Sequence, residues 1–166
     1  ARDHFYGLQE AKTDLAGIAI FDRLEKSLAK NTPLQELMWQ RREIENYFCT
    51  EAVLLAWAVG TSPSDLFAIA EQERRVAAMH HAINEVTRLL AIDEKSPWSP
   101  DVKATDEVLD RIFRVFFRKM ELPVLFRKHS YYELIDHLPA EQFAPEITEK
   151  LDAIVAVAAC AHPWKE

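Results

Sequence analysis

The sequence predicts an α-rich α/β fold, in which part of a sheet is followed by a helical bundle. Two short apolar runs, 17–21 and 34–40, have the length of buried strands. From Thr50 onward, apolar residues recur with helical spacing. Glycine occurs only 3 times in 166 residues, and all-β folds use many more glycines in their turns. We therefore expect an α/β segment over residues 1–48 and a helical bundle over residues 49–166.

Composition bounds the function classes. Apolar residues make up 49% of the chain, enough for a packed core, and the net charge of -7 argues against a generally basic nucleic-acid surface. A local basic patch or an acidic metal site remains compatible with that charge. The two cysteines, Cys49 and Cys160, lack metal-ligand spacing, so a reduced, cytoplasmic protein is expected. No apolar run approaches the roughly 20 residues that span a bilayer.

The N-terminal part follows α/β logic. A short helix is expected over 8–14, followed by the first strand, a polar connection broken at Asn31-Thr32-Pro33, and the second strand. This region is too small for a complete sheet. The sequence also starts without a signal peptide or an initiator Met, so we expect a piece of a longer chain.

The helical part begins with Thr50, a predicted N-cap for a helix over 52–59 that Gly60 ends. A long helix is expected from Ser62 or Ser64, as caps, to about Asp93. Along it a stripe of apolar residues recurs every seven positions: Ile69, Val76, Ile83 and Leu90. The stripe is either the buried face of an antiparallel helical pair or a coiled-coil contact.

Three further helices complete the predicted bundle. One starts near Thr105, a short one starts at Ser130, and the last opens at Pro145. In the last helix the residues expected to face inward are Ile147, Leu151, Ile154 and Ala158. The aromatic residues Phe113, Phe116 and Phe117, flanked by Arg111, Arg114, Arg118 and Lys119, are either core or a nucleic-acid platform. Helical spacing favours core.

Two places carry candidate chemistry. Asp22 follows the first apolar run, and parallel sheets place metals and ligands at the carboxyl ends of strands. A solvated loop carboxylate is the other interpretation. Glu43 and Glu45 would share one face of an extended segment beside Arg41 and Arg42. The alternative there is a charged surface turn that leads into a helix.

The segment Arg41-Arg42-Glu43-Ile44-Glu45-Asn46-Tyr47-Phe48 resembles the REIENY segment of bacterial ATPases whose C-terminal part is a Toprim-like nuclease domain. These ATPases are relatives of the OLD (overcoming lysogenisation defect) nucleases. In that group a strand that ends in Asp, often as Asp-x-Asp, precedes the segment, and 18–22 stands in its place here. The stretches 127–134 and 144–154 resemble a family segment with a Lys before a short helix, and the family's closing helix.

The resemblance implies a partial Toprim-like sheet and metal-dependent cleavage of DNA or RNA, with a role in phage defence. It implies that Mg²⁺ or Mn²⁺ is held by Asp22, Glu43 and Glu45, with Glu45 also catalytic. Lys128 would neutralise developing phosphate charge. Leu24 stands where the family has the second Asp of the pair.

The implied partners are an upstream ATPase domain and a nucleic acid, and no membrane. No G-x-x-x-x-G-K-[ST] loop occurs, so no nucleotide site is expected in this chain. The alternative function is a non-catalytic helical interaction module of a larger ATPase. In that case Asp22 and Glu43 are structural, and the stripe from Ile69 to Leu90 pairs with another subunit, as in a homodimer.

Overall fold

The computed structural model describes residues 2–25, 27–28, 33–60 and 65–162. The chain divides into two compact units, one formed by Ala1–Gln40 with Ala144–Glu166 and the other by Arg41–Phe143. The predicted boundary lay between residues 48 and 49, with the last helix in the helical bundle, and the observed division differs from it in both respects. Residues 41–48 are bonded to the loop that follows residue 98, whereas the last helix packs against the first strand. The chain is mostly helical, with one small parallel sheet.

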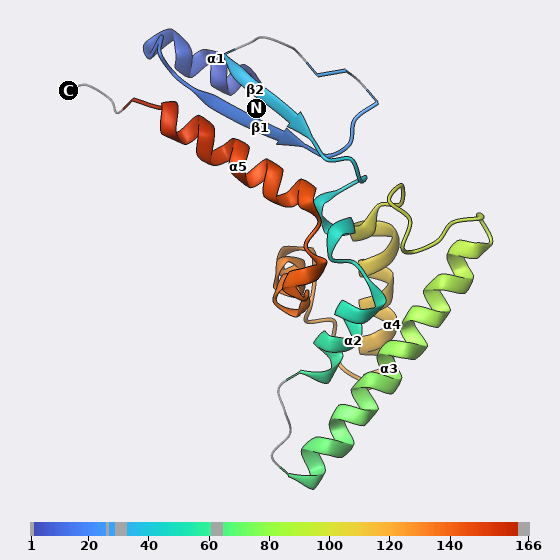
Figure 1. Cartoon of the computed structure of the whole chain (residues 1–166). Helices are drawn as coiled ribbons and strands as arrows, with labels where there is room; N and C mark the ends of the chain where they lie inside the picture. The colour runs from blue at the N-terminus through green and yellow to red at the C-terminus, as the bar shows by residue number, and fades with distance from the viewer. Residues whose placement is uncertain (1, 26, 29–32, 61–64, 163–166) are drawn as a thin grey trace. The chain divides into compact units, whose positions relative to one another are not determined.

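The first unit is built on two parallel strands, with Gly17 opposite Leu34 and Phe21 opposite Met38. The two expected strands are confirmed, although the second ends at Met38 and not at Gln40. The last helix runs along the first strand (Figure 1). The elements of this unit are α1 (Arg2–Ala11), β1 (Gly17–Phe21), β2 (Leu34–Met38) and α5 (Pro145–Cys160).

Close packing explains the glycine at the start of β1. A Cβ atom at Gly17 would lie 2.5 Å from the Phe5 ring, so only glycine lets α1 lie this close to the strand. On α5, the face that is withdrawn from solvent carries Glu146, Lys150 and Val157. The predicted inward face was wrong at Leu151, which is 56% exposed, because this residue lies off that helical face. Ile154, at 40%, and Ala158 are also exposed, whereas Ile147 is half-buried.

The second unit packs three α-helices around an aromatic core. Its elements are η1 (Ile44–Tyr47), α2 (Glu51–Val59), α3 (Leu66–Ala91), the π-helical η2 (Ala104–Leu109), α4 (Asp110–Met120), and the 3₁₀ segments η3 (Lys128–His137) and η4 (Ala140–Gln142). Thr50 caps α2 as predicted, accepting a hydrogen bond from the Val53 N–H at 3.3 Å. Gly60 ends the helix with a φ of 66°.

Helix α3 is capped by Asp65, whose carboxylate accepts from the Ala68 N–H at 2.9 Å. The predicted caps Ser62 and Ser64 lie outside the described residues. The apolar stripe of α3 is divided. Ile83 and Leu90 are buried within the unit, where α3 packs against α2 and α4, but Ile69 is 43% exposed. The first turn adds Leu66 and Phe67, which are exposed at 78% and 88%.

The aromatic residues of α4 are core, as their spacing favoured. Phe113 and Phe116 are 0% and 2% exposed, and their ring centroids lie 4.9 and 5.4 Å from that of Trp57. The platform interpretation is therefore wrong for these rings, since buried rings cannot stack on bases. None of the described helices has the length and hydropathy needed to cross a membrane.

Candidate functional site

Glu43 occupies a structural position. Its side chain is buried, and one carboxylate oxygen accepts hydrogen bonds from the Thr105 N–H at 3.0 Å and from the Thr105 hydroxyl at 2.8 Å. Its backbone N–H donates to the Asn46 side-chain oxygen at 2.8 Å. A buried carboxylate is stable only when such donors compensate its lost hydration. These bonds give Glu43 a role in the fold.

The rest of the Arg41–Phe48 segment also joins distant parts of the second unit. The Asn46 amide donates to the Ser99 carbonyl at 3.2 Å and to the Val102 carbonyl at 3.0 Å. The Arg42 N–H donates to the Pro100 carbonyl at 2.7 Å. The segment thus connects the start of the second unit to the loop before η2. The Asn46 side chain supplies hydrogen-bond donors to loop carbonyl groups, in place of the backbone donors of a regular helix or strand.

The remaining predicted carboxylates have different surroundings. Glu45 is half-buried, and its charge, with that of Glu43, adds to the effect of burial in raising the pKa of the Cys49 thiol to about 12. Asp22 is exposed at the end of β1 and belongs to the first unit. Among the described residues, no group of three or more His, Cys, Asp or Glu side chains is arranged to hold a metal ion.

Lys128 opens η3, and its ammonium lies 3.8 Å from the Asp106 carboxylate. The Lys103 ammonium lies 3.4 Å from the same carboxylate. Both ion pairs are at least partly exposed to solvent, and Lys128 shares the Asp106 carboxylate with Lys103, so this carboxylate holds Lys128 only weakly. Lys128 also lines a cavity of the second unit, and it is the one predicted site residue in the described lining.

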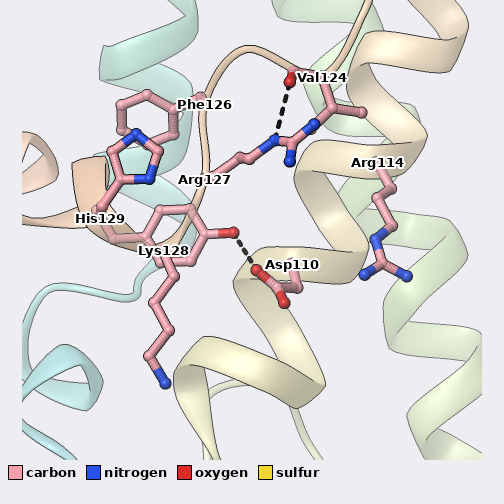
Figure 2. A pocket seen from close by; sticks show the side chains of 8 residues that line it. Asp110, Arg114, Val124, Phe126, Arg127, Lys128 and His129 are labelled. Carbon is pink, nitrogen blue, oxygen red and sulfur yellow. Dashed lines mark hydrogen bonds between the residues drawn. The ribbon is translucent and has the colours of Figure 1, made fainter.

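This cavity has a volume of about 540 Å³ and lies between the first turns of α4 and the chain that leads into η3. Figure 2 shows Arg114, Arg127 and Lys128 on different sides of Asp110, with the Lys128 ammonium pointing away from the Arg127 guanidinium. Its described lining includes three permanent cations, one histidine and one carboxylate. The lining residues are Asp110, Arg114, Val124, Phe126, Arg127, Lys128, His129 and Tyr131.

An aromatic cluster makes one wall of this cavity rigid. The Phe126 ring is buried, and its centroid lies 4.9 Å from that of Trp57 and 4.7 Å from that of Phe113. The Tyr131 ring stacks on Phe113 at 5.6 Å. Because Phe126 and Tyr131 bracket residues 127–130, their burial fixes the backbone that carries the cationic side chains. The cavity is therefore built on core packing, although its cations come from a loop.

The carboxylate of Asp110 faces the hydroxyl of Tyr131, which donates a short hydrogen bond to it (Figure 2). Burial, and then this hydrogen bond, raise the pKa of Tyr131 above its usual range. At neutral pH the tyrosine is therefore a hydrogen-bond donor and not a nucleophile. The hydrogen bond from Tyr131 orients the Asp110 carboxylate. The choice of ligand therefore depends on the other polar side chains that line the cavity.

The side chain of Arg127 is hydrogen-bonded to the backbone of the preceding loop. Among the described residues its guanidinium makes one hydrogen bond, from Nε to the Val124 carbonyl at 3.2 Å (Figure 2). Its terminal amino groups remain available to a ligand. Arg114 lies one helical turn after Asp110, so both side chains project from the same face of α4. Permanent cations around a concave site attract anions, and paired guanidinium groups suit phosphate.

The sequence singles out Lys128 as a site residue. It offers Arg114 only as one of the cations that flank the aromatic residues of α4, and Arg127 only within a stretch that resembles a family segment. The run Arg127-Lys128-His129 between a helix end and a short helix was an available signal, because it concentrates positive charge in a loop. Asp110 and Arg114 lie near residues 127–129 only in the folded chain, so local sequence patterns do not predict that they line the same cavity.

No model of a known protein family matches the chain, and neither curated proteins nor solved structures give a match.

Proposed function

We propose that the second unit binds the phosphate groups of a nucleic-acid strand, and that the basic cavity is the contact point. The observation that carries the proposal is that Arg114, Arg127 and Lys128 line one cavity of about 540 Å³, and that Asp110 is the one carboxylate in its described lining. The chain as a whole carries a net charge of -7. A local cationic site in an acidic chain binds phosphate at one place and does not coat a duplex.

The ring of His129 supports a nucleic acid as the ligand. This residue is exposed and lines the cavity together with the cations. Proteins that bind single strands combine basic side chains with aromatic rings on which bases stack, and histidine serves in that role. A phosphate held by the arginines would bring its nucleoside within reach of such a ring.

Binding of a labelled single-stranded oligonucleotide, followed by fluorescence anisotropy at about 50 and 200 mM salt, tests the proposal. Arg127→Ala should weaken binding by about tenfold or more, since it removes charge-assisted hydrogen bonds. Lys119→Ala is the matched control, because Lys119 is exposed, lies on the same helix as Arg114 and does not line the cavity. Equal losses in the two variants, or no binding at low salt, would refute the proposal.

Metal-dependent cleavage by a Toprim-like nuclease, working with an ATPase domain, is a second candidate that the sequence resemblance motivates. It is motivated by the spacing of Glu43 and Glu45, two residues apart in the segment that resembles the family. Two carboxylates in one neighbourhood attract a divalent cation such as Mg²⁺ or Mn²⁺. The resemblance also names Asp22, which belongs to the first unit, as a metal ligand, and Lys128 as the phosphate contact.

A DNA-nicking assay with Mn²⁺ separates the two candidates. Cleavage that is lost in Glu45→Gln and in Asp22→Asn, while oligonucleotide binding persists, would support the nuclease. Binding without cleavage in the wild-type protein would leave phosphate binding as the function of this chain.

A further inference from the structure

The first unit leaves one edge of its small sheet open. Among the residues that the structure describes, β2 is the one strand that pairs with β1. β1 carries no polar side chain, as is typical of the interior strands of parallel sheets, yet all five of its residues are only half-buried. β2 instead has the features of a protected edge, since Pro33 precedes it and the charged Glu36 lies within it. Of the two outer edges, the one on β1 is therefore suited to a further strand.

The backbone of β1 determines which hydrogen-bonding groups face this open edge. The Phe21 carbonyl accepts a hydrogen bond from the Trp39 N–H at 3.0 Å, so it points toward β2. Backbone groups alternate in direction along a strand, so Ala19 also faces β2, whereas the N–H and carbonyl groups of Ile18 and Ile20 face outward. If two copies of β1 paired antiparallel about a two-fold axis at Ala19, Ile18 of one copy would lie opposite Ile20 of the other. Every outward group would then have a partner.

Helix α5, which packs on β1, has an apolar side that extends past this strand. Its residues Ala156 and Cys160 line a hollow together with Gln35 of β2, so that side of the helix is turned toward β2. Leu151 and Ile154 project from the opposite side, beyond the open edge of β1, and they are 56% and 40% exposed. An apolar side of a helix that faces solvent is typical of a surface that another protein element covers.

From these two features we propose that the chain forms a homodimer through its first unit, in which β1 pairs antiparallel with β1 of a second copy and the two α5 helices pack against each other. Two strands occupy about 10 Å across a sheet, which is also the distance between packed helices. Each α5 would thus lie beside its counterpart over one continuous sheet. A single added strand from another partner would leave the exposed side of α5 without a helix to cover it.

The positions of the strand and helix contacts agree with a single two-fold axis. Val157 lies at the start of β1, and α5 runs in the direction opposite to the strand (Figure 1). Ala19, at the centre of β1, lies about 6.6 Å further along the strand, which equals about four to five residues of a helix. Ala19 is therefore level with the turn of α5 that holds Leu151 and Ile154. An axis at this level brings Leu151 of one copy opposite Ile154 of the other, and both side chains are apolar.

Sedimentation equilibrium of the whole chain tests the dimer. We expect twice the monomer mass for the wild-type protein and the monomer mass for Leu151→Glu, because its carboxylate would be buried between the α5 helices. Ala159→Glu is the matched control, since Ala159 is exposed on another side of α5, and this variant should remain dimeric. A monomeric wild-type protein, or equal dimerisation of the two variants, would overturn the proposal.

A disulfide cross-link tests the strand pairing separately. Ala19 and its counterpart in the second copy would form a non-hydrogen-bonded pair, whose Cα atoms are about 4.5 Å apart and within the range of a disulfide. The exposed Cys160 is first replaced, as Cys160→Ser. In that background Ala19→Cys should form an interchain disulfide under mild oxidation, and Gln35→Cys, on β2, should not. No cross-link at Ala19→Cys, or a cross-link at Gln35→Cys alone, would overturn the proposal.

Discussion

The carboxylate of Glu43 accepts hydrogen bonds from both the N–H and the hydroxyl of Thr105, a residue 62 positions away in the sequence. This relationship assigns the most distinctive segment of the chain to folding. Two hydrogen-bond donors on one buried oxygen compensate for the lost hydration of the carboxylate, and the Asn46 amide bonds hold the same segment to the following loop.

Glu43→Ala should therefore destabilise the second unit by about 2–4 kcal/mol, since it leaves the buried Thr105 donors without an acceptor. Glu43→Gln retains an oxygen acceptor and should cost less. Urea unfolding followed by tryptophan fluorescence measures both, with Glu73→Ala on the exposed face of α3 as the control. The structural role would be contradicted if Mn²⁺ raised the melting temperature of the wild-type protein but not that of Glu43→Gln.

Asp110→Asn should increase the affinity for a single-stranded oligonucleotide by about threefold to tenfold, because it removes the one carboxylate of the described lining. The amide oxygen still accepts the Tyr131 hydroxyl, so the fold should be unchanged. Anisotropy at low salt measures the gain. A weaker affinity in Asp110→Asn would mean that the carboxylate contacts the ligand favourably, contrary to the charge argument.

Stability should fall in alkaline solution because of Cys49. Burial, followed by the nearby charges of Glu45 and Glu43, raises the pKa of its thiol from 9.0 to about 12 in the folded protein. The unfolded thiol ionises first, so the stabilisation is complete below pH 9 and decreases as the pH rises toward 12. This linkage amounts to about 1.4 kcal/mol between pH 8 and 10.

Urea midpoints at those two pH values, compared between the wild-type protein and Cys49→Ala, measure this contribution. The variant keeps every other titratable group, so the difference in the two slopes reports Cys49 alone. Identical slopes would show that the thiol is accessible to solvent in the folded state.

Helix α3 should tolerate changes in its first turn and not in its second half. Phe67→Ala, at a side chain that is 88% exposed, should alter the free energy of unfolding by less than about 0.5 kcal/mol. Ile83→Ala, at a side chain that is 4% exposed, should cost about 2–5 kcal/mol. The reverse order in urea titrations would show that another surface covers the first turn.

Homodimerisation through the stripe stays a prediction. Within the stripe, Ile69 is exposed and Val76 is half-buried, and the first turn of α3 adds the exposed residues Leu66 and Phe67. Sedimentation velocity of the wild-type protein and of Phe67→Glu tests it. A dimer that Phe67→Glu dissociates would support the interaction module, and a monomer in both would exclude association through these residues.

Local patterns predicted several elements well, although the first helix, expected over 8–14, runs over Arg2–Ala11. The apolar run 17–21 is a strand with those bounds, and Thr50 and Gly60 begin and end α2, because capping and positive φ depend on single residues. The arrangement in units was not predictable in this way. The return of α5 to β1 and the bonds from Glu43 to Thr105 are long-range, and no local periodicity encodes them.

The candidate site shows the same limit. Lys128 was identified because its stretch resembles a family segment, whereas the role of Arg114 depends on the loop that Phe126 anchors against Trp57 and Phe113. Asp22 lies in the first unit and the other predicted site residues in the second. Metal ligation by Asp22, Glu43 and Glu45 accordingly stays a prediction. The basic cavity instead depends on the packing of aromatic residues that are far apart in the sequence.

The most direct measurement is a two-dimensional NMR titration of the arginine Nε–H signals with the single-stranded oligonucleotide. If the cavity holds phosphate, the signals of Arg114 and Arg127 should shift together in a saturable manner, while Arg88, exposed near the end of α3, stays unchanged. Uniform small shifts of all arginines, or saturation at Arg88 without Arg114 and Arg127, would contradict the account.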